Sequence, residues 1–375
     1  MQIRPYTPSD QLAWDLYVRR HSEATHCHLT GWKDVIEETY GHKGFYLLAE
    51  ENSKIVGILP LIHVRVRFLG GTLCSMPFLN YGGTLSDSPE AAAALLQEAA
   101  RLASRLGVRT IELRQTSPIP CQDSWLPMPL ARRGDKIRMV LPLSGPAETF
   151  FASLKSKLKS QIRRPLKEGM TAKVGGAELA EDFYAVFARN MRDLGSPVHS
   201  PKLFKQIFRH LDASTLTSGE PANGASPESQ DGAAPPPRVH IGVVYHPQGP
   251  VAAGLVVSFR RTVEIPWASS LRAYNRFSPN MLLYWSLLEH AINEGHRAFD
   301  FGRSTPMEGT YRFKEQWGAR PQPLYWYVIG PSTRSGQFLA DAGSKVRTWA
   351  AAAWSRLPLP VANTIGPWIR GAIPL

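Results

Sequence analysis

The stretch that decides the fold is GHRAFDFG, which runs from Gly295 to Gly302. A close echo of it, GVRTIELR, runs from Gly107 to Arg114 in the first half of the chain. Both stretches read Gly-x-Arg-x-apolar-acid-apolar, and both follow a predicted helix with a proline in its first turn. Since the same order of elements occurs twice, the chain is predicted to contain two copies of one α/β unit.

Each copy also has strands upstream of its helix, IVGILPL from Ile55 to Leu61 and VAAGLVV from Val251 to Val257. A strand that follows the helix returns to the sheet by a crossover, so each unit is expected to be a mixed, twisted sheet flanked by helices. The predicted fold class is therefore α/β (α+β), with tandem domains. Residues 1–145 are expected to form the first domain and residues 146–330 the second, followed by a basic amphipathic tail over residues 331–375.

The net charge of +12 is concentrated in two segments of the chain. Ser153–Lys173 carries seven basic residues and one acid, and residues 331–375 carry five basic residues and one acid, so their net charges are +6 and +4. The remaining chain is nearly neutral. This distribution argues against an extended nucleic-acid-binding face and leaves two local surfaces that suit anions.

Cysteine content and hydropathy predict a cytoplasmic protein. The three cysteines, Cys27, Cys74 and Cys121, lie far apart and form no CxxC pair, which suits a reducing compartment. The N-terminal stretch lacks the apolar core of a signal peptide, and no run approaches the roughly 18 apolar residues of a membrane span. We therefore expect a cytoplasmic location, with any membrane contact peripheral.

Three segments depart from the ordinary domain pattern. Residues 147–164 are predicted to form one basic amphipathic helix that Pro165 kinks or ends, with a basic side that is either solvated or faces nucleotide, tRNA or lipid phosphate. Residues 212–237 are rich in Ser, Gly and Pro and are predicted to be an exposed, mobile insertion. In the tail, apolar residues form a helical stripe: Val346, Trp349, Ala350, Ala353, Trp354 and Leu357.

Two positions are open for this tail stripe. It either packs on the body of the protein or lies in a membrane interface, with Arg347, Arg356 and Arg370 at the lipid headgroups. Four prolines that follow the stripe, Pro358, Pro360, Pro367 and Pro374, exclude a membrane span. Peripheral contact with a membrane or a partner is the favoured alternative.

Six motifs carry a resemblance to a known family. They are THCHLTGWKDVIEETYGH, MPFLNYGGTLSD, FASLKSKLKSQIRRPLKEG, FDFGRST, YRFKEQWGA and WSRLPLPVANTIGPWI, and they are spread over almost the whole chain, from Thr25 to Ile369. The order of elements resembles the GNAT acyltransferase fold. The tandem arrangement resembles the Fem family of peptidoglycan-bridge aminoacyltransferases, above all the FemAB-like proteins of exosortase/PEP-CTERM exopolysaccharide systems. The resemblance implies acyl or aminoacyl transfer to an amine of an exopolysaccharide or cell-envelope precursor, such as a lipid-linked saccharide.

The resemblance leaves two donors open, acyl-CoA and aminoacyl-tRNA. Some Fem enzymes have a helical coiled-coil arm suited to tRNA, whereas this chain has the Ser/Gly/Pro insertion there, so tRNA is not favoured. GNAT enzymes hold the coenzyme A pyrophosphate with a glycine-containing turn at a helix N-terminus. The matching turn here, YNRFSPNM from Tyr274 to Met281, has no glycine. Either a side chain such as Arg276 replaces those amides, or the donor is not acyl-CoA.

Acyl transfer to an amine requires removal of a proton and stabilisation of a developing oxyanion. Asp300 is either a core acid bonded to the next loop's amides or to Arg303, or a cleft acid that orients or deprotonates the amine. The resemblance implies a functional lysine at Lys314, near the transferred carbonyl; the alternative is a solvated lysine paired with Glu308 or Glu315. Arg303 either contacts negative charge or forms an ordinary salt bridge.

The remaining candidates are substrate-binding residues around the two predicted crossovers. In the family, the first half helps to bind the acceptor. The candidates are Tyr311, Phe313, Ser304, Tyr274, Asn275, Arg276, Asn80, Tyr81 and Arg114.

No metal is expected. In the sequence HCH (His26–His28), adjacent strand residues would point to opposite faces, and no second ligand pair has zinc spacing. The second function hypothesis is a non-catalytic scaffold, a degenerate GNAT pair that holds components of polysaccharide assembly. The turn without glycine is its main support.

Overall fold

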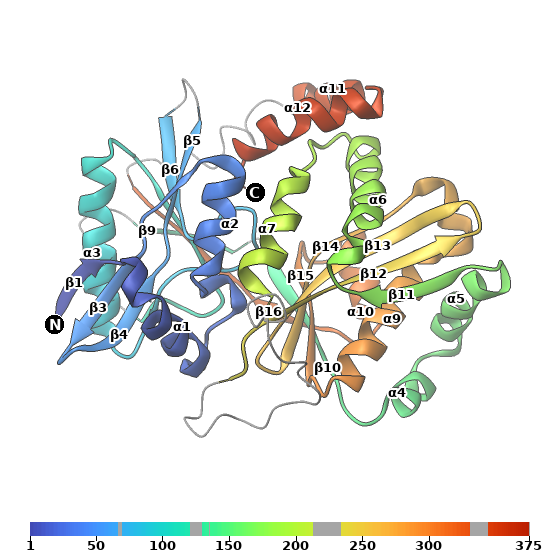
Figure 1. The fold of residues 1–375 in the computed structure, drawn as a ribbon, viewed down its shortest axis with the longest axis horizontal. Helices are drawn as coiled ribbons and strands as arrows, with labels where there is room; N and C mark the ends of the chain where they lie inside the picture. Colours follow the sequence, from blue (N-terminus) through green and yellow to red (C-terminus); the bar gives the residue numbers. More distant parts are fainter. Residues whose placement is uncertain (67–69, 121–129, 135, 213–233, 331–343, 375) are drawn as a thin grey trace.

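The computed structural model describes residues 1–66, 70–120, 130–134, 136–212, 234–330 and 344–374. Most of the predicted insertion and the first part of the tail lie outside these ranges. The described chain forms mixed sheets flanked by helices, which confirms the predicted fold class (Figure 1). One sheet has the strand order β1-β3-β4-β7, the second β2-β5-β6-β8-β17-β9, and the third β11-β12-β13-β14-β15-β10-β16.

The first half of the chain supplies most strands of the first two sheets and one strand of the third. Its elements are β1 (Gln2–Pro5), α1 (Gln11–Arg20), α2 (Gly31–Tyr40), β2 (Lys43–Gly44), β3 (Leu47–Glu51), β4 (Lys54–Leu59), β5 (Ile62–Val66), β6 (Gly70–Cys74), β7 (Leu85–Ser86), α3 (Pro89–Arg105), β8 (Ile111–Gln115), β9 (Leu130–Arg133) and β10 (Ile137–Pro142).

The second half builds the rest of the third sheet, its helices and the tail. Its elements are α4 (Ala147–Ser153), α5 (Ser156–Lys167), β11 (Thr171–Gly175), α6 (Ala180–Asp193), α7 (Pro201–Leu211), β12 (Arg238–His246), β13 (Gly249–Phe259), β14 (Thr262–Ser270), α9 (Pro279–Asn293), β15 (Ala298–Ser304), α10 (Gly309–Glu315), β16 (Arg320–Pro323), β17 (Tyr325–Ile329), α11 (Ser344–Trp354) and α12 (Leu359–Gly371).

The predicted repeat is present as two parallel crossovers. Helix α3 connects β6 to β8, and helix α9 connects β14 to β15, with parallel pairing in both cases. The expected signals set the ends of α3: the Ser88 hydroxyl accepts from the Ala91 amide, Pro89 is the first residue, and Gly107 adopts φ 65° just beyond the last turn. The sequence echo therefore marks the same supersecondary unit twice.

The two halves exchange one strand each. Strand β17 lies late in the chain but pairs antiparallel with β8 of the first half. Strand β10 precedes residue 145 but pairs antiparallel with β15 of the second half. Each crossover strand, β8 or β15, therefore pairs with a strand from the other half of the chain. The predicted domain limits divide the chain by position, whereas two of the sheets contain strands from both halves.

A shared core holds the halves together. It contains Trp14 and Trp32 from the first half, Phe204 and Trp267 from the second, and Trp326 on the exchanged strand β17. Helices α2 and α7 pack against each other at this junction, as Figure 1 shows. Two further clusters lie under the individual sheets, one against α3 and one against α5 and α9. Side chains on both sides of the junction therefore have fixed relative positions.

Two local predictions were wrong. The basic segment is two helices, because Leu154 and Lys155 are extended (ψ 148° and 144°) and Leu154 turns into the core; Pro165 is tolerated within the last turn of α5. The HCH sequence is a short 3-10 helix with all three residues buried, not a strand, and Thr25 caps it in a capping box with His28.

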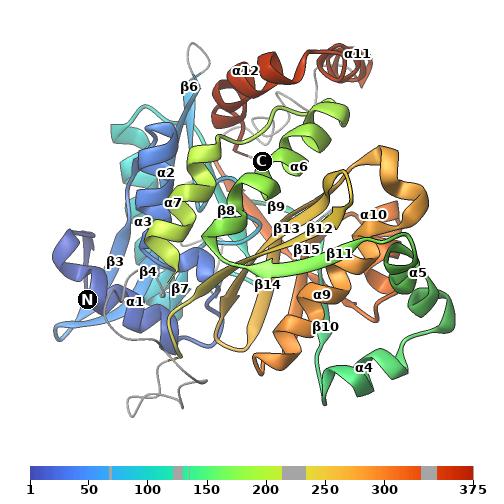
Figure 2. The same cartoon turned by 45° about the vertical axis from the view of Figure 1, so that its right-hand side comes forward.

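The tail helix α12 packs on the body next to α6 (Figure 2). Arg370, expected at lipid headgroups, instead points inward, and its Nε donates to His199 Nε2 at 3.1 Å. Among the described residues, no helix combines the length and apolar character that a membrane crossing requires.

Candidate active site

Two carboxylates lie side by side where β14 and β15 pair. Glu264 and Asp300 are register partners on these parallel strands and are only 4% and 2% exposed. Their neighbours Val263 and Phe299 point to the opposite face, into the core under α9. Since strand residues alternate between faces, both acids point toward the junction with the first half.

The strands separate just beyond this pair, because the parallel register ends at Glu264 and Asp300. Gly302 adopts φ +70° at this point, and a Cβ there would lie 2.8 Å from Asn80 Nδ2. The left-handed backbone favours glycine, and a Cβ here would press on the Asn80 side chain. The FDFG sequence therefore places an irregularity inside β15, where its pairing with β10 shifts register and its parallel pairing with β14 has ended.

Asp300 is held from three sides. The Tyr81 hydroxyl donates to both carboxylate oxygens at 3.0 and 2.9 Å, the Gly302 amide donates to Oδ1 at 2.8 Å, and Arg138 Nε lies 3.8 Å from Oδ2. Burial and the neighbouring Glu264 raise the pKa of Asp300 to about 6, although Arg138 and the hydrogen bonds lower it. A carboxylate with this pKa is a stronger base than an exposed one.

Glu264 has its own partners from the first half. Its carboxylate accepts from Asn80 Nδ2 at 3.1 Å and lies 2.8 Å from His26 Nε2. Trp32 Nε1 donates to His26 Nδ1 at 3.2 Å, so the ring proton of a neutral His26 lies on Nε2 and is donated to Glu264.

The described residues include one group with metal-ligand chemistry: His26, Cys27 and Glu264, whose ligand atoms lie within 4.8 Å of one another. Both His26 ring nitrogens already have hydrogen-bond partners. A metal would have to displace Glu264 or Trp32 from the ring, so the observed contacts of His26 do not fit a metal site.

Lys314 anchors the end of β15, just after Asp300. Its Nζ donates to the carbonyls of Gly302 and Arg303 at 3.1 and 2.8 Å, and the residue is 7% exposed. The alternative of a solvated lysine paired with Glu308 or Glu315 is therefore wrong. Burial lowers the pKa of Lys314 to about 8, against the opposing effect of Asp300. The ammonium thus lies beside the divergence of β14 and β15.

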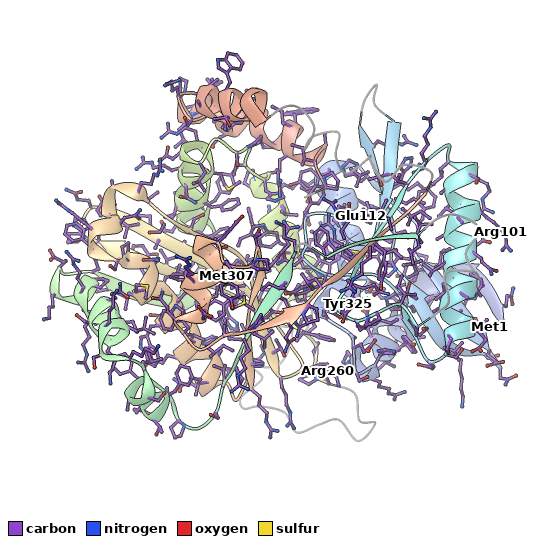
Figure 3. The ribbon with its side chains drawn as sticks, turned by 180° about the vertical axis from the view of Figure 1, so that it is seen from behind. Met1, Arg101, Glu112, Arg260, Met307 and Tyr325 are labelled. Carbon is purple, nitrogen blue, oxygen red and sulfur yellow. The ribbon has the colours of Figure 1, made fainter. Side chains whose placement is uncertain are left out.

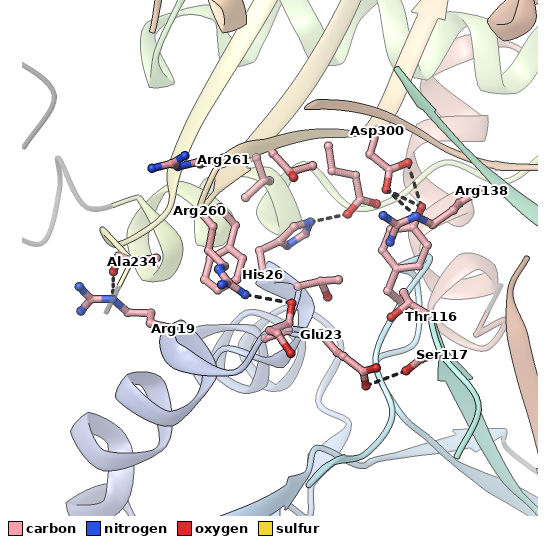
Figure 4. Close-up of a pocket in the computed structure, with 18 of the residues that line it drawn as sticks. Arg19, Glu23, His26, Thr116, Ser117, Arg138, Ala234, Arg260, Arg261 and Asp300 are labelled. Carbon is pink, nitrogen blue, oxygen red and sulfur yellow. Dashed lines mark hydrogen bonds and ion pairs between the residues drawn. The ribbon is translucent and has the colours of Figure 1, made fainter. Parts of the chain in front are cut away.

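A cavity of about 840 Å³ opens onto this network between the two halves. Figure 4 shows Asp300 and Arg138 at one end of it and Arg19 at the other. The walls combine basic and acidic side chains with smaller polar ones. They include Arg19, Glu23, His26, Tyr81, Thr116, Ser117, Arg138, Arg260, Arg261, Glu264 and Asp300.

Comparison with known proteins places this geometry in a known fold. Residues 230–315, which contain Glu264, Asp300 and Lys314, match the model of an acetyltransferase (GNAT) domain. Among solved structures, FemX is 14% identical, with 88% of this chain and 97% of that chain covered and a TM-score of 0.63. A tandem GNAT protein from the clavulanic acid biosynthesis pathway is 12% identical, with 88% and 99% covered and a TM-score of 0.53.

A third structure is the C-terminal domain of an Agrobacterium fabrum protein assigned as a lysylphosphatidylglycerol synthetase. It is 11% identical, with 89% of this chain and 95% of that chain covered and a TM-score of 0.53. A search of curated protein sequences returned no match. The chain has a tandem GNAT fold. At these identities the structural likeness shows the fold alone, while the domain match supports a transferase activity.

The predicted site residues fall into three groups according to their position relative to the two cavities. Asp300 and Tyr81 line the cavity, and Asn80 and Lys314 bond to the same network. Phe313 lies on the other side, in a smaller pocket of about 190 Å³ with Ser270, Asn280 and Tyr284. Tyr274, Asn275, Arg276, Ser304, Tyr311, Arg303 and Arg114 line neither pocket.

Several members of this last group have other contacts in the GNAT fold. Arg303, expected to pair with Asp300 or Glu308, has its guanidinium over Trp326 at 4.8 Å. The Tyr274 hydroxyl donates to Gln248 at 3.0 Å, and the Tyr311 hydroxyl to Glu315 at 3.2 Å. Arg276 stacks on its neighbour Phe277, and the buried Ser304 hydroxyl has no hydrogen-bond partner within the described ranges.

Arg114 is the clearest case of a structural role. It is fully buried, bonds to Glu112 at 2.9 Å, stacks on Trp326 and donates to the Pro374 carbonyl at 2.7 Å. These contacts tie the end of the chain to β8 and leave the guanidinium no access to a substrate.

Sequence reasoning missed three residues of the network: Glu264, Arg138 and His26. Glu264 carried the same signal as Asp300, an acid between apolar strand residues in TVEIPW. His26 was considered only as a metal ligand. Arg138 carried no local signal, because only the exchange of β10 into the third sheet brings it to Asp300.

Proposed function

We propose that this protein is an acyltransferase that moves an acyl or aminoacyl group onto an amine of an exopolysaccharide or cell-envelope precursor. The observation that supports the proposal best is the pair Glu264 and Asp300, buried at the point where two parallel GNAT strands separate and reached from a cavity between the halves. A lipid-linked saccharide is the acceptor that we favour. Two carboxylates attract its ammonium group, and one of them has a raised pKa that suits proton removal.

In the proposed reaction the ammonium group of the acceptor enters through the cavity and releases one proton to solvent, and Asp300 takes a second proton from the nitrogen as its bond to the acyl carbon forms. Tyr81 and the Gly302 amide hold the Asp300 carboxylate in place, and Glu264 helps to attract the incoming ammonium. The amine nitrogen forms a bond to the acyl carbon while the bond from that carbon to the donor's sulfur or oxygen breaks. The proton passes from Asp300 to the leaving group, which departs as a thiol or a hydroxyl.

Lys314 is proposed to stabilise the oxyanion that forms on the acyl carbonyl. Two of its three ammonium hydrogens are held by the carbonyls of Gly302 and Arg303, which fixes the group with little freedom. We propose that the third hydrogen is donated to a substrate oxygen. With a pKa of about 8, Lys314 is mostly charged at neutral pH. We assign Arg303 a secondary role, adding positive charge at the end of β15.

The donor is proposed to be an acyl-CoA thioester, with aminoacyl-tRNA as the alternative. The acetyltransferase-domain match supports a thioester. The smaller pocket lies against β14 and the first turn of α9, and its polar groups Ser270 and Asn280 suit an amide-containing chain. We propose that this pocket receives the donor while the larger cavity receives the acceptor, so that the two meet at Asp300 and Lys314.

A thermal-shift screen with coenzyme A, acetyl-CoA and UDP-sugars tests the proposal, followed by a thiol-release assay with amine acceptors. We expect a donor at 100 times its Kd to stabilise the protein by about 2.7 kcal/mol. We also expect thiol release that depends on the amine and is lost in Asp300→Asn. If no donor shifts the melting temperature and no thiol is released, acyl-CoA is excluded as the donor, and an assay of transfer from aminoacyl-tRNA then separates the alternative donor from the non-catalytic scaffold.

A further inference from the structure

The outer face of the tail helix α12 carries large apolar side chains. Val361, Ile365, Trp368 and Ile369 follow helical spacing on one side and are 43, 40, 84 and 41% exposed. The side that faces the body carries Ala362 and Gly366, both buried. A helix on the surface of a soluble protein has the opposite arrangement, with its large apolar residues turned inward.

The small residues let α12 lie close against the body. A Cβ on Gly366 would lie 3.1 Å from the Val198 amide nitrogen, and one on Gly371 would lie 2.9 Å from the Tyr40 ring. The outer apolar residues therefore cannot be buried by a tighter fit of the helix, because the inner side is already in close contact.

Hydrogen bonds also fix the orientation of α12. The Gly371 carbonyl lies 2.7 Å from His42 Nε2, and Arg370 donates to His199. Just after the helix, the Pro374 carbonyl accepts from Arg114 and from the Phe78 amide. Rotating α12 to turn Trp368 inward would break these contacts, so the apolar face is held outward.

The neighbouring helix α11 extends the same surface. Its Trp349 is 74% exposed, and Figures 1 and 2 both place α11 and α12 along one edge of the molecule. From Ser344 to Leu375 the sequence has four basic residues and no acid. Arg370 is used internally, but Arg356 is exposed, and the exposed Arg65 of β5 is close enough to lower the pKa of His42 beside the end of α12.

We infer that this surface, Trp349 with the outer face of α12, binds the interface of an anionic lipid bilayer. Tryptophan and aliphatic side chains on a fixed helix enter the headgroup region, and positive charge without nearby acids in the same segment suits phosphate headgroups. The helix lies in the interface and does not cross the bilayer. This inference is independent of the proposed acyl transfer, because it involves none of the cavity residues.

Vesicle co-sedimentation of the full chain tests the inference. We expect binding to vesicles of equal parts phosphatidylglycerol and phosphatidylcholine, with affinity lower by on the order of tenfold for phosphatidylcholine alone or in about 1 M salt. Trp368→Ser should weaken binding by a similar factor, and Arg356→Glu should weaken it for the anionic vesicles alone. Leu12→Ser is the matched control, since Leu12 is 71% exposed on α1, and it should bind like the wild type.

Circular dichroism melting shows that the variants are folded; because Trp368, Arg356 and Leu12 are exposed, their substitution should leave the melting temperature unchanged. The inference is overturned if the wild type does not bind anionic vesicles at low salt, or if Trp368→Ser binds as tightly as Leu12→Ser. It is also overturned if the surface is occupied by a second copy of the chain. In that case light scattering would show a dimer that Trp368→Ser converts to a monomer.

Discussion

Glu112 on β8 and Asp300 on β15 occupy the same position in the two copies of the crossover unit, yet their surroundings differ. Glu112 accepts from Arg114, two residues further along the same strand, at 2.9 and 2.8 Å. The equivalent residue after Asp300 is Gly302, which supplies only an amide. Figure 3 shows Glu112 near the middle of the molecule, not far from Tyr325 on β17. One acid is closed off by its own strand, and the other opens onto a cavity.

The comparison shows how two copies of one unit can differ in role, with one acid used in packing and the other available to a ligand. An arginine two residues after the acid fills the face of β8, neutralises the charge and binds the end of the chain. A glycine in that place brings no charged side chain to the face of β15, and its left-handed backbone lies just beyond the last residue of β15 that pairs with β14. We propose that the second copy does the chemistry while the first supports it with Tyr81, Asn80 and His26.

The largest effect is expected from a substitution at Asp300, the acid that opens onto the cavity. Asp300→Asn keeps the shape and the hydrogen bond from Tyr81 but cannot take a proton. We expect kcat to fall by about 10²–10⁴-fold, the usual contribution of a general base. The measurement is steady-state thiol release with the donor and amine identified by the screen. A variant with more than half of the wild-type rate would contradict the assignment of Asp300 as the base.

The second prediction concerns Glu112, the acid that pairs with Arg114 in the first crossover unit. Glu112→Gln leaves the Arg114 guanidinium buried without a counter-charge, so the free energy of unfolding should fall by about 3–5 kcal/mol. Urea denaturation measures this loss through the transition midpoint. Below its melting transition the variant should keep the wild-type rate. If it is as stable as the wild type but inactive, the contrast between the two acids is wrong.

The third prediction concerns Lys314. Lys314→Met preserves the packing of the chain but removes the ammonium, and kcat should fall by about 10²–10³-fold, as for the loss of one oxyanion donor. Lys314→Arg is the charge-retaining comparison and should recover part of the rate. Equal rates for the Met and Arg variants would show that the lysine acts only as a support for the turn at Gly302.

The smallest effects are in pH dependence. The proposed reaction needs Asp300 ionised and Lys314 charged, so kcat/KM should rise through about pH 6 and fall through about pH 8. In Lys314→Arg the upper limb should move to higher pH, because arginine stays charged. The check is a profile measured from pH 5 to 10. An upper limb that stays in place would exclude Lys314 as its source.

The raised pKa of Asp300 also determines the direction in which the stability of the protein changes with pH. Its folded pKa lies above the value of about 3.9 in the unfolded chain, so protonation favours the fold. This contribution is complete below about pH 4 and is lost as the pH rises through about 6. Relative to the wild type, Asp300→Asn should therefore be more stable at pH 8 than at pH 4, which melting curves at the two pH values measure.

Local signals in the sequence predict most of the elements and part of the site. Capping residues and periodicity give α2, α3 and the strands from β12 to β14, and the echo around Gly107 and Gly295 gives the crossovers. An acid inside the apolar strand FDF marks Asp300, and Glu264 could have been found by the same rule. These signals work because they depend on residues that are neighbours in the chain.

The rest depends on contacts between distant segments. Arg138 reaches Asp300 only because β10 joins the sheet of the second half. His26 reaches Glu264 across 238 positions. Neither contact leaves a periodic pattern in the sequence, and the outward face of α12 is defined by its packing against Val198 and Tyr40 and by its hydrogen bonds to His42 and His199.

The exchange of β10 and β17 has a consequence for folding during synthesis on the ribosome. When β8 leaves the ribosome, its partner β17 still lies 210 residues further along the chain, from Gln115 to Tyr325. At a synthesis rate of about 5–20 residues per second, the edge of β8 that pairs with β17 would remain unpaired for on the order of 10–40 seconds. During this interval the nascent first half has an open sheet edge, so chaperone protection should matter more for this chain than for a string of independent domains.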